Sequence, residues 1–226
     1  LDEGIIRPES VESIAEIGEQ NWHNINPIVF KTLLEKKLVD RLDRDKWFKK
    51  FQDIVDQASE DNLWLFDVAQ LYYSLIFGDF EYFSVDMHGS PRSVVADLNY
   101  EFRSEKQYNL VTNLGTSEHI FNQAQVFKTI HEMTAKNGLI YHGLPHQGQF
   151  NHGFFNYHPT FFFDLAAANN YEIKLFFFDG IKTVGTHEDH ILERIEKDAA
   201  YETLITSGKI PSQAALHIVF LKLDDT

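Results

Sequence analysis

The feature of this sequence that most constrains its fold is an alternation between short apolar runs and longer segments of helical spacing. The apolar runs lie at 11–17, 82–85, 94–96, 108–112, 139–144, 172–178 and 214–223. The segments of helical spacing among them lie at 63–77, 121–135, 160–170 and 188–207. Strands that alternate with helices of this length are typical of a parallel sheet covered by helices on both faces. The sequence therefore predicts an α/β fold with a doubly wound, mostly parallel, seven-stranded sheet.

The length of 226 residues suits one large α/β domain. Residues 21–60, after the first predicted strand, are polar and charged but carry two apolar stripes of helical spacing. The pair Asn26-Pro27 predicts a helix start in this segment. We expect a helical cap inserted over the ligand site, with Trp22, Trp47 and Phe51 closing over a substrate. An extra helical layer without a catalytic role and an oligomer contact are the alternatives.

Composition narrows the classes of partner. The net charge of −14 repels phosphate backbones, so nucleic acid is an unfavourable partner and a small-molecule substrate is expected. The one basic stretch, 31–50, is interleaved with acids and is interpreted as a solvated helical face. There is no cysteine, which fits a reducing cytoplasm, and no apolar run is long enough to span a bilayer. The sequence does not begin with Met, so it is expected to start inside a longer protein.

Polar residues follow the first four predicted strands. They are Gly18, Asp86, Asp97 and Asn113, with Glu118 and His119 in the turn after the fourth strand. In doubly wound sheets, ligands bind beyond the carboxyl ends of the strands, where the strand order reverses. These residues are therefore candidates for a ligand site, although polar residues at strand ends are also common turn formers.

With these residues in place, the chain resembles the class I S-adenosylmethionine-dependent methyltransferases from about residue 11 to residue 223. The segments that carry the resemblance are YFSVDMHG, VVADLN, YNLVTNLGTSEHIFNQAQVFKTIHEMTAKNGLIYHGLP and HGFFNYHPTFFFDLAAANNYEI. The resemblance implies that the turn at Gly18 supports the methionine moiety, Asp86 holds the ribose, Asp97 receives the adenine amino group and Asn113 lies beside the transferable methyl. It assigns cofactor contacts to Glu16, Gly18, Gln20, Asp86, Asp97, Leu98 and Asn113.

The turn after the first strand departs from the family pattern. It reads EIGEQNWH and contains one glycine where relatives have several. A degenerate domain that binds a ligand or partner without turnover is therefore an alternative to an enzyme. A dinucleotide-binding dehydrogenase is the nearest rival of similar fold, but the GxGxxG pattern that it requires is absent.

The loop after the fifth predicted strand is rich in histidine. His142, His146, His152 and His158 fall within seventeen positions, and neighbouring strands would bring this loop close to Glu118 and His119. A loop histidine is a natural general base, and the candidates are His119, His152 and His146. His131 and His217 are interpreted as structural, because they fall inside a predicted helix and a predicted strand. His142, inside the fifth predicted strand, is interpreted as a hydrogen-bonded core histidine or as a wall of the pocket.

A closer resemblance concerns the small-RNA 2′-O-methyltransferases and the ubiquinone-pathway O-methyltransferases, which carry a metal-binding ExxEH pattern after the fourth strand. The segments GTSEH and NHGFFNYHP look similar. The resemblance implies that Glu118, His119 and His152 bind a divalent metal, with Gly115 in place of the first acid. Such ligands suit Zn²⁺, Mn²⁺ or Fe²⁺ better than Mg²⁺. The alternative for Glu118 and His119 is that they mark the start of the following helix and bind no metal.

Together, these features predict an S-adenosylmethionine-dependent methyltransferase acting on a hydroxyl or amine of a small polar molecule or sugar. A non-enzymatic ligand-binding protein and a metal-dependent O-methyltransferase are the competing hypotheses.

Overall fold

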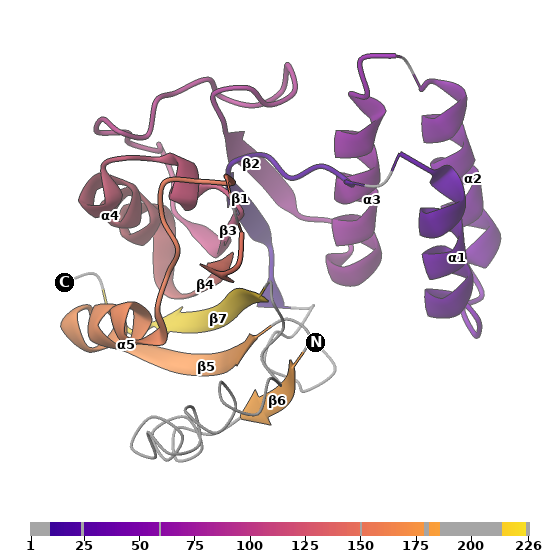
Figure 1. Cartoon of the computed structure of the whole chain (residues 1–226). Coiled ribbons are helices and arrows are strands. Elements are labelled where there is room, and N and C mark those ends of the chain that lie inside the picture. Colours follow the sequence, from indigo (N-terminus) through magenta and orange to yellow (C-terminus); the bar gives the residue numbers. More distant parts are fainter. Residues whose placement is uncertain are drawn as a thin grey trace.

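The computed structural model describes residues 10–23, 25–58, 60–149, 151–178, 181–185 and 214–224. Its centre is a seven-stranded mixed sheet with the strand order β2-β1-β3-β4-β7-β5-β6 (Figure 1). The strands are β1 (Ser13–Ile17), β2 (Glu81–Val85), β3 (Tyr108–Leu114), β4 (Thr134–Gln147), β5 (Tyr171–Phe178), β6 (Ile181–Gly185) and β7 (Ala214–Lys222).

The predicted α/β sheet is confirmed in outline, and the observed sheet is mixed: β1 to β5 run in one direction, whereas β6 and β7 run in the other. β1 pairs in parallel with β2 and β3, and β3 with β4. In contrast, β7 lies antiparallel to β4 and β5, and β5 lies antiparallel to β6. The predicted strand at 94–96 is reduced to an isolated bridge between Val94 and Val85, because Val94 and Val95 are exposed and bury little apolar surface. The strand at 181–185 was not predicted, although an Asp-Gly pair after an apolar run is a hairpin signal.

Two strands extend further than their sequence signals suggest. Asn113 lies inside β3 and not after it. β4 continues past Pro145 to Gln147, with an irregularity in its pairing to β7 between these two residues. Proline lacks a backbone N–H, so it is tolerated at such an irregularity in the ladder.

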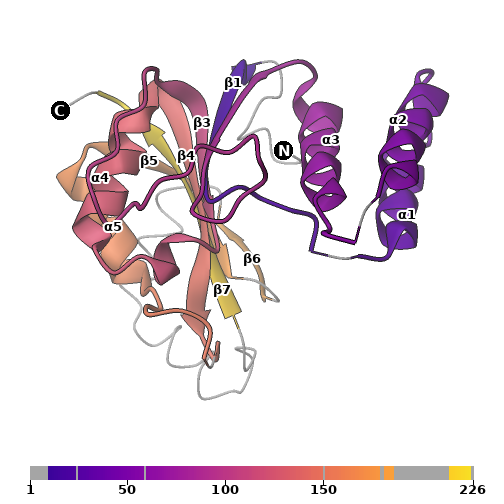
Figure 2. The ribbon, with the colours of Figure 1, turned by 90° about the horizontal axis from the view of Figure 1, so that it is seen from above.

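Helices cover both faces of the sheet (Figure 2). On one face lie α4 (Gln123–Met133) and α5 (Pro159–Ala168); on the other lies α3 (Trp64–Phe77). Neighbouring residues of β3 pack on opposite faces of the sheet: Leu110 belongs to the hydrophobic cluster beneath α3, whereas Val111 packs on the side of α4 and α5. The predicted helix at 188–207 lies outside the described residues.

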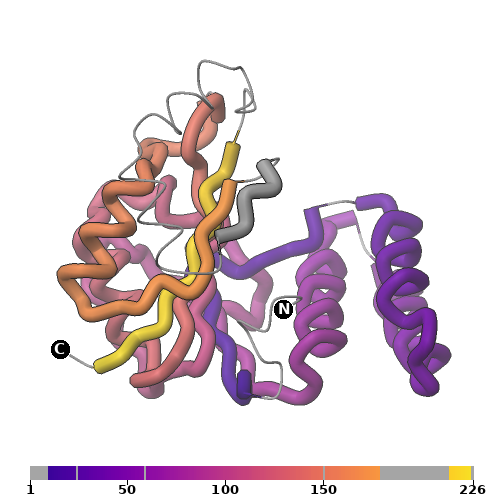
Figure 3. The backbone as a smooth tube through the Cα atoms, turned by 90° about the horizontal axis from the view of Figure 1, so that it is seen from below, coloured from indigo at the N-terminus to yellow at the C-terminus, as the bar shows by residue number. Residues whose placement is uncertain are grey.

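Residues 21–60 form an outer helical layer. α1 (Pro27–Lys37) and α2 (Arg44–Asp56) stand beside α3, on its side remote from the sheet (Figures 2 and 3). The predicted start of α1 is confirmed, because Asn26 caps it with a hydrogen bond from the backbone N–H of Ile28. Trp47 and Phe51 are buried in the core between these helices. Their burial places them where they pack the layer together, and the closing of this layer over a substrate stays a prediction.

Among the helices in the described part of the chain, none is both long enough and apolar enough to cross a bilayer.

Candidate active site

The strand order reverses at β1, which makes the carboxyl ends of β1 and β3 the switch point of the sheet. From β1 the chain continues to β2 on one side, and later to β3 on the other. This is the position at which open α/β sheets form their ligand crevice. Gly18 follows β1 with φ +76°, a left-handed conformation that only glycine adopts at low cost. A Cβ atom at Gly18 would lie 2.0 Å from Oγ1 of Thr116, so the turn after β3 packs directly on this glycine.

Glu16, on β1, supports the turn at Gly18 through hydrogen bonds. Its buried carboxylate accepts hydrogen bonds from the hydroxyls of Tyr73 (2.6 Å) and Tyr82 (2.5 Å) and from the backbone N–H of Gln20 (2.8 Å). Burial raises the pKa of Glu16, although these three donors oppose the shift. These internal contacts of Glu16 shape the turn, and a contact of Glu16 with a cofactor stays a prediction.

Gln20 spans the switch point. Its side-chain amide donates to the carbonyl of Gly18 (3.2 Å) and to the carbonyl of Leu114 at the end of β3 (2.8 Å). The amide therefore ties the turn after β1 to the end of β3. Its amide donors serve these internal bonds, and a contact of Gln20 with the cofactor stays a prediction.

Asp86, directly after β2, accepts a hydrogen bond from the backbone N–H of Glu19 (2.8 Å) and another from that of His88 (2.7 Å). Glu19 in turn is buried and accepts from the backbone N–H (2.5 Å) and the hydroxyl (2.9 Å) of Ser90. These contacts join the ends of β1 and β2. Each carboxylate oxygen of Asp86 accepts one of these bonds and keeps a further lone pair.

The other two predicted nucleoside contacts differ in burial. Asp97 is exposed, and its Oδ1 accepts from the backbone N–H and the side chain of Asn99. Leu98 is buried in the main core, on the same side of the sheet as α4 and α5. Its side chain therefore contributes to packing.

Asn113 is completely buried in a polar network that sequence reasoning missed. Its side-chain amide donates to the hydroxyl of Ser117 (2.9 Å) and lies 3.0 Å from Nδ1 of His142. Ser117 also lies 3.0 Å from the hydroxyl of Tyr157, which donates to Gln123 (2.6 Å). Burial lowers the pKa of His142 to about 3, so this imidazole is neutral and acts as the expected core histidine. The network holds the turn after β3 against the loop after β4.

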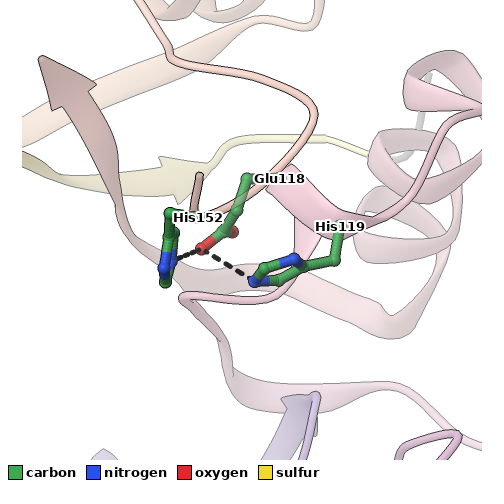
Figure 4. A group of neighbouring side chains, drawn as sticks. All are labelled: Glu118, His119 and His152. Atoms are coloured by element: carbon green, nitrogen blue, oxygen red, sulfur yellow. Dashed lines mark hydrogen bonds and ion pairs between the residues drawn. The ribbon is translucent and has the colours of Figure 1, made fainter. Parts of the chain in front are cut away.

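Glu118, His119 and His152, here called the Glu118 cluster, come together as predicted (Figure 4). Nε2 of His152 lies 3.2 Å and Nε2 of His119 lies 3.7 Å from Oε1 of Glu118. Glu118 is fully buried, whereas the side chains of His119 and His152 are 47% and 44% exposed. The cluster thus presents two imidazoles to solvent around a buried carboxylate.

The second oxygen of Glu118, Oε2, is buried and has no hydrogen-bond partner within the described part of the chain. Burial raises the pKa of Glu118, and the two histidines act in the opposite direction. Gly153 permits this close packing, because a Cβ there would lie 2.7 Å from Cγ of Glu118. A buried carboxylate that is not fully paired is costly, which marks it as a candidate functional group.

His146, the third base candidate, lies away from this cluster. It is buried, with Nδ1 2.8 Å from the carbonyl of Tyr157, and its ring packs against Phe178 and His158. Burial lowers its pKa. Nδ1 of His131 lies 2.6 Å from the Tyr171 hydroxyl, and Nδ1 of His217 lies 2.9 Å from the Tyr141 hydroxyl, within the helix and strand where they were expected.

Comparisons with known proteins match neither a protein-family model nor a curated protein. Several solved structures that resemble the chain are described as methyltransferases. An S-adenosylmethionine-dependent methyltransferase of Mesorhizobium loti has 8% identity and a TM-score of 0.48, over 97% of this chain and 94% of that one. An O-methyltransferase of a Brevibacillus brevis multienzyme, in complex with S-adenosyl-L-homocysteine, has 9% identity and a TM-score of 0.44, over 96% and 68%.

A phosphoethanolamine N-methyltransferase of Haemonchus contortus, in complex with S-adenosyl-L-methionine, has 15% identity and a TM-score of 0.42, over 70% of this chain and 46% of that one. At TM-scores below 0.5, these similarities do not identify a reaction, so a function has to be argued from this chain's own residues.

Proposed function

We propose that this protein is an S-adenosylmethionine-dependent methyltransferase that methylates a hydroxyl or an amine of a small polar molecule or a sugar. The observation that carries the proposal is the short turn after β3. Thr116 packs on Gly18 at the switch point, and Glu118, two residues later, contacts both imidazoles of the cluster. The switch point, where open α/β sheets bind ligands, and a set of proton-accepting side chains therefore share one segment.

The residues at the strand ends suit the cofactor in chemical terms. Asp86 keeps an acceptor lone pair on each carboxylate oxygen, which matches the two donors of a ribose diol. Asp97, exposed after the bridge at Val94, is the candidate for the adenine amino group. The cofactor supplies a methyl group on a cationic sulfur, and the acidic surroundings of Glu19 and Asp86 favour a cation.

The Glu118 cluster would act on the proton of the acceptor. With the His152 Nε2–H donating to Glu118, Nδ1 is left as the basic nitrogen. Glu118 then orients the imidazole and stabilises its protonated form, as the carboxylate does in other acid–histidine pairs. A histidine base contributes about 10²–10⁴-fold to a rate, and alignment of the two reactants contributes about 7–11 kcal/mol.

Calorimetry with S-adenosylmethionine and a turnover assay test this proposal together. We expect micromolar binding that Asp86→Ala abolishes and that Asp53→Ala, an exposed acid on α2, leaves unchanged. Turnover is assayed against hydroxyl, amine and carboxylate acceptors. Absence of binding contradicts the proposal, and binding without turnover against any acceptor favours the non-enzymatic ligand-binding alternative.

A metal-dependent O-methyltransferase is a second candidate, favoured by the ligand geometry of the Glu118 cluster. One oxygen of Glu118 and one nitrogen of each histidine lie within 4.8 Å of one another. One carboxylate and two imidazoles suit Zn²⁺, Mn²⁺ or Fe²⁺, and Gly115 in place of a fourth ligand leaves positions open.

Elemental analysis of the purified protein distinguishes this candidate. We expect about one equivalent of metal, lost in His119→Ala and retained in His23→Ala, a variant of an exposed histidine before α1. A metal content that His119→Ala leaves unchanged would rule out the Glu118 cluster as the site.

A further inference from the structure

Three phenylalanine rings stand beside the Glu118 cluster. The centroid of Phe121 lies 6.5 Å from that of Phe154 and 6.4 Å from that of Phe155, and Phe154 and Phe155 are 6.5 Å apart. The backbone N–H of Phe154 donates to the carbonyl of Glu118 (2.7 Å), and Phe121 follows His119 by two residues. The aromatic group is therefore attached to the same two loops that build the cluster.

The exposure of these rings is unusual for this chain. Phe121 is 76% and Phe154 is 68% exposed, and among the phenylalanines that the structure describes no other is more than half exposed. Leaving large apolar rings in water forgoes about 25 cal/mol per Å² of burial. Exposed aromatic side chains next to convergent polar groups are typical of binding sites.

The two loops also indicate the charge of the ligand. Residues 115–123 and 146–158 contain no Lys or Arg and a single acid, Glu118. An anionic acceptor would find no permanently charged Lys or Arg side chain on these loops. The same residues include six Asn or Gln, of which Asn151, next to His152 in the sequence, and Asn156 are exposed. An amide side chain offers both donors and an acceptor, which matches a ligand with several hydroxyl groups.

We infer that Phe121, Phe154 and Phe155 form the acceptor subsite and that the acceptor is an uncharged sugar. The inference rests on the proposed function. A sugar ring has apolar C–H faces, which the phenylalanines would cover, and hydroxyl groups at its rim for the amides. In the transfer, the O–H proton of the sugar passes to His152. The C–S bond of the donor sulfonium breaks as the new O–C bond forms, which leaves a neutral thioether.

Saturation-transfer NMR tests the subsite without requiring turnover. The probes are methyl glucoside, methyl mannoside and methyl galactoside. Glucuronic acid is the anionic comparison compound, and catechol is the phenolic one. Each compound is measured with and without S-adenosylhomocysteine. We expect signals from at least one uncharged glycoside. Phe154→Ala should weaken its binding about tenfold, because aromatic contacts are worth about that much. Leu42→Ala, which truncates an exposed apolar residue between α1 and α2, is the matched control and should change nothing.

The outcomes separate the two proposals. The sugar subsite is wrong if no glycoside binds, if catechol or glucuronic acid alone binds, or if Phe154→Ala has no effect on glycoside binding. In each of these cases the methyltransferase proposal stands as long as S-adenosylmethionine binds. If the glycoside binds through Phe154 but S-adenosylmethionine does not bind, the subsite is correct and the transfer reaction is wrong.

Discussion

The buried carboxylate of Glu118 lies 3.2 Å from Nε2 of His152, although 34 positions separate the two residues in the sequence. They meet because β3 and β4 are parallel neighbours, so the turn after one strand faces the loop after the other. The pairing gives the switch point of the sheet an acid–histidine pair, and its consequences can be measured.

His152→Ala should lower kcat about 10²–10⁴-fold, because it removes the proposed base. His23→Ala, which truncates an exposed histidine on the segment before α1, should leave kcat unchanged. Both variants are compared under saturating S-adenosylmethionine, with cofactor affinity measured separately by calorimetry. A kcat for His152→Ala within about threefold of the unmodified protein contradicts a role of His152 in proton transfer.

The proximity of Glu118 and His152 could be predicted from the sequence, whereas the hydrogen-bond network around Asn113 could not. An acid and a histidine after one strand, and histidines after the next, meet in any parallel arrangement of the two strands. The contacts of Asn113 with Ser117 and His142 depend on the register of β3 against β4 and on Asn113 lying inside the strand. Hydrophobic periodicity does not fix either property.

The antiparallel direction of β7 was also not predicted from the sequence. An apolar run such as 214–223 reads the same in a parallel and in an antiparallel sheet, and only the path of the preceding chain decides between them. The roles of Glu16 and Gln20 were assigned from resemblance to relatives, and their internal hydrogen bonds depend on Tyr73, Tyr82 and Leu114, far away in the sequence. Motif positions identified the turn after β1 as a candidate but not the partners of its side chains.

Gly18→Ala should destabilise the protein more than Gly115→Ala. Both glycines have positive φ, which costs an alanine about 1–2 kcal/mol. Only at Gly18 would the new Cβ meet a side chain at 2.0 Å, that of Thr116, whereas a Cβ at Gly115 would lie 3.6 Å from Oε1 of Glu118. Overpacking adds about 1–3 kcal/mol to the loss at Gly18. Urea unfolding measures the difference, and equal losses in the two variants would contradict the contact between the turns.

Glu16 should make the free energy of unfolding fall as the pH rises. Its pKa is raised above 4.5 in the folded protein, so between 4.5 and the folded value the native state holds more protons than the unfolded chain. The contribution of Glu16 is therefore fully present below pH 4.5 and is lost as the pH rises through its folded pKa. Glu16→Gln should remove this component. Urea unfolding of both proteins between about pH 4.5 and 8 tests it, and parallel pH profiles would show that Glu16 does not titrate differently on unfolding.

Leu34→Ala should weaken the outer helical layer without changing cofactor affinity. Leu34 is fully buried in the cluster that α1 and α2 form with α3, and truncation of such a leucine costs about 2–5 kcal/mol. Because the described contacts of this cluster lie among the helices, the folded variant should bind S-adenosylmethionine with an unchanged Kd in calorimetry at low temperature. The exposed Leu42→Ala should affect neither quantity. If residues 21–60 instead close over the ligand site, loosening the layer will raise the Kd in Leu34→Ala alone.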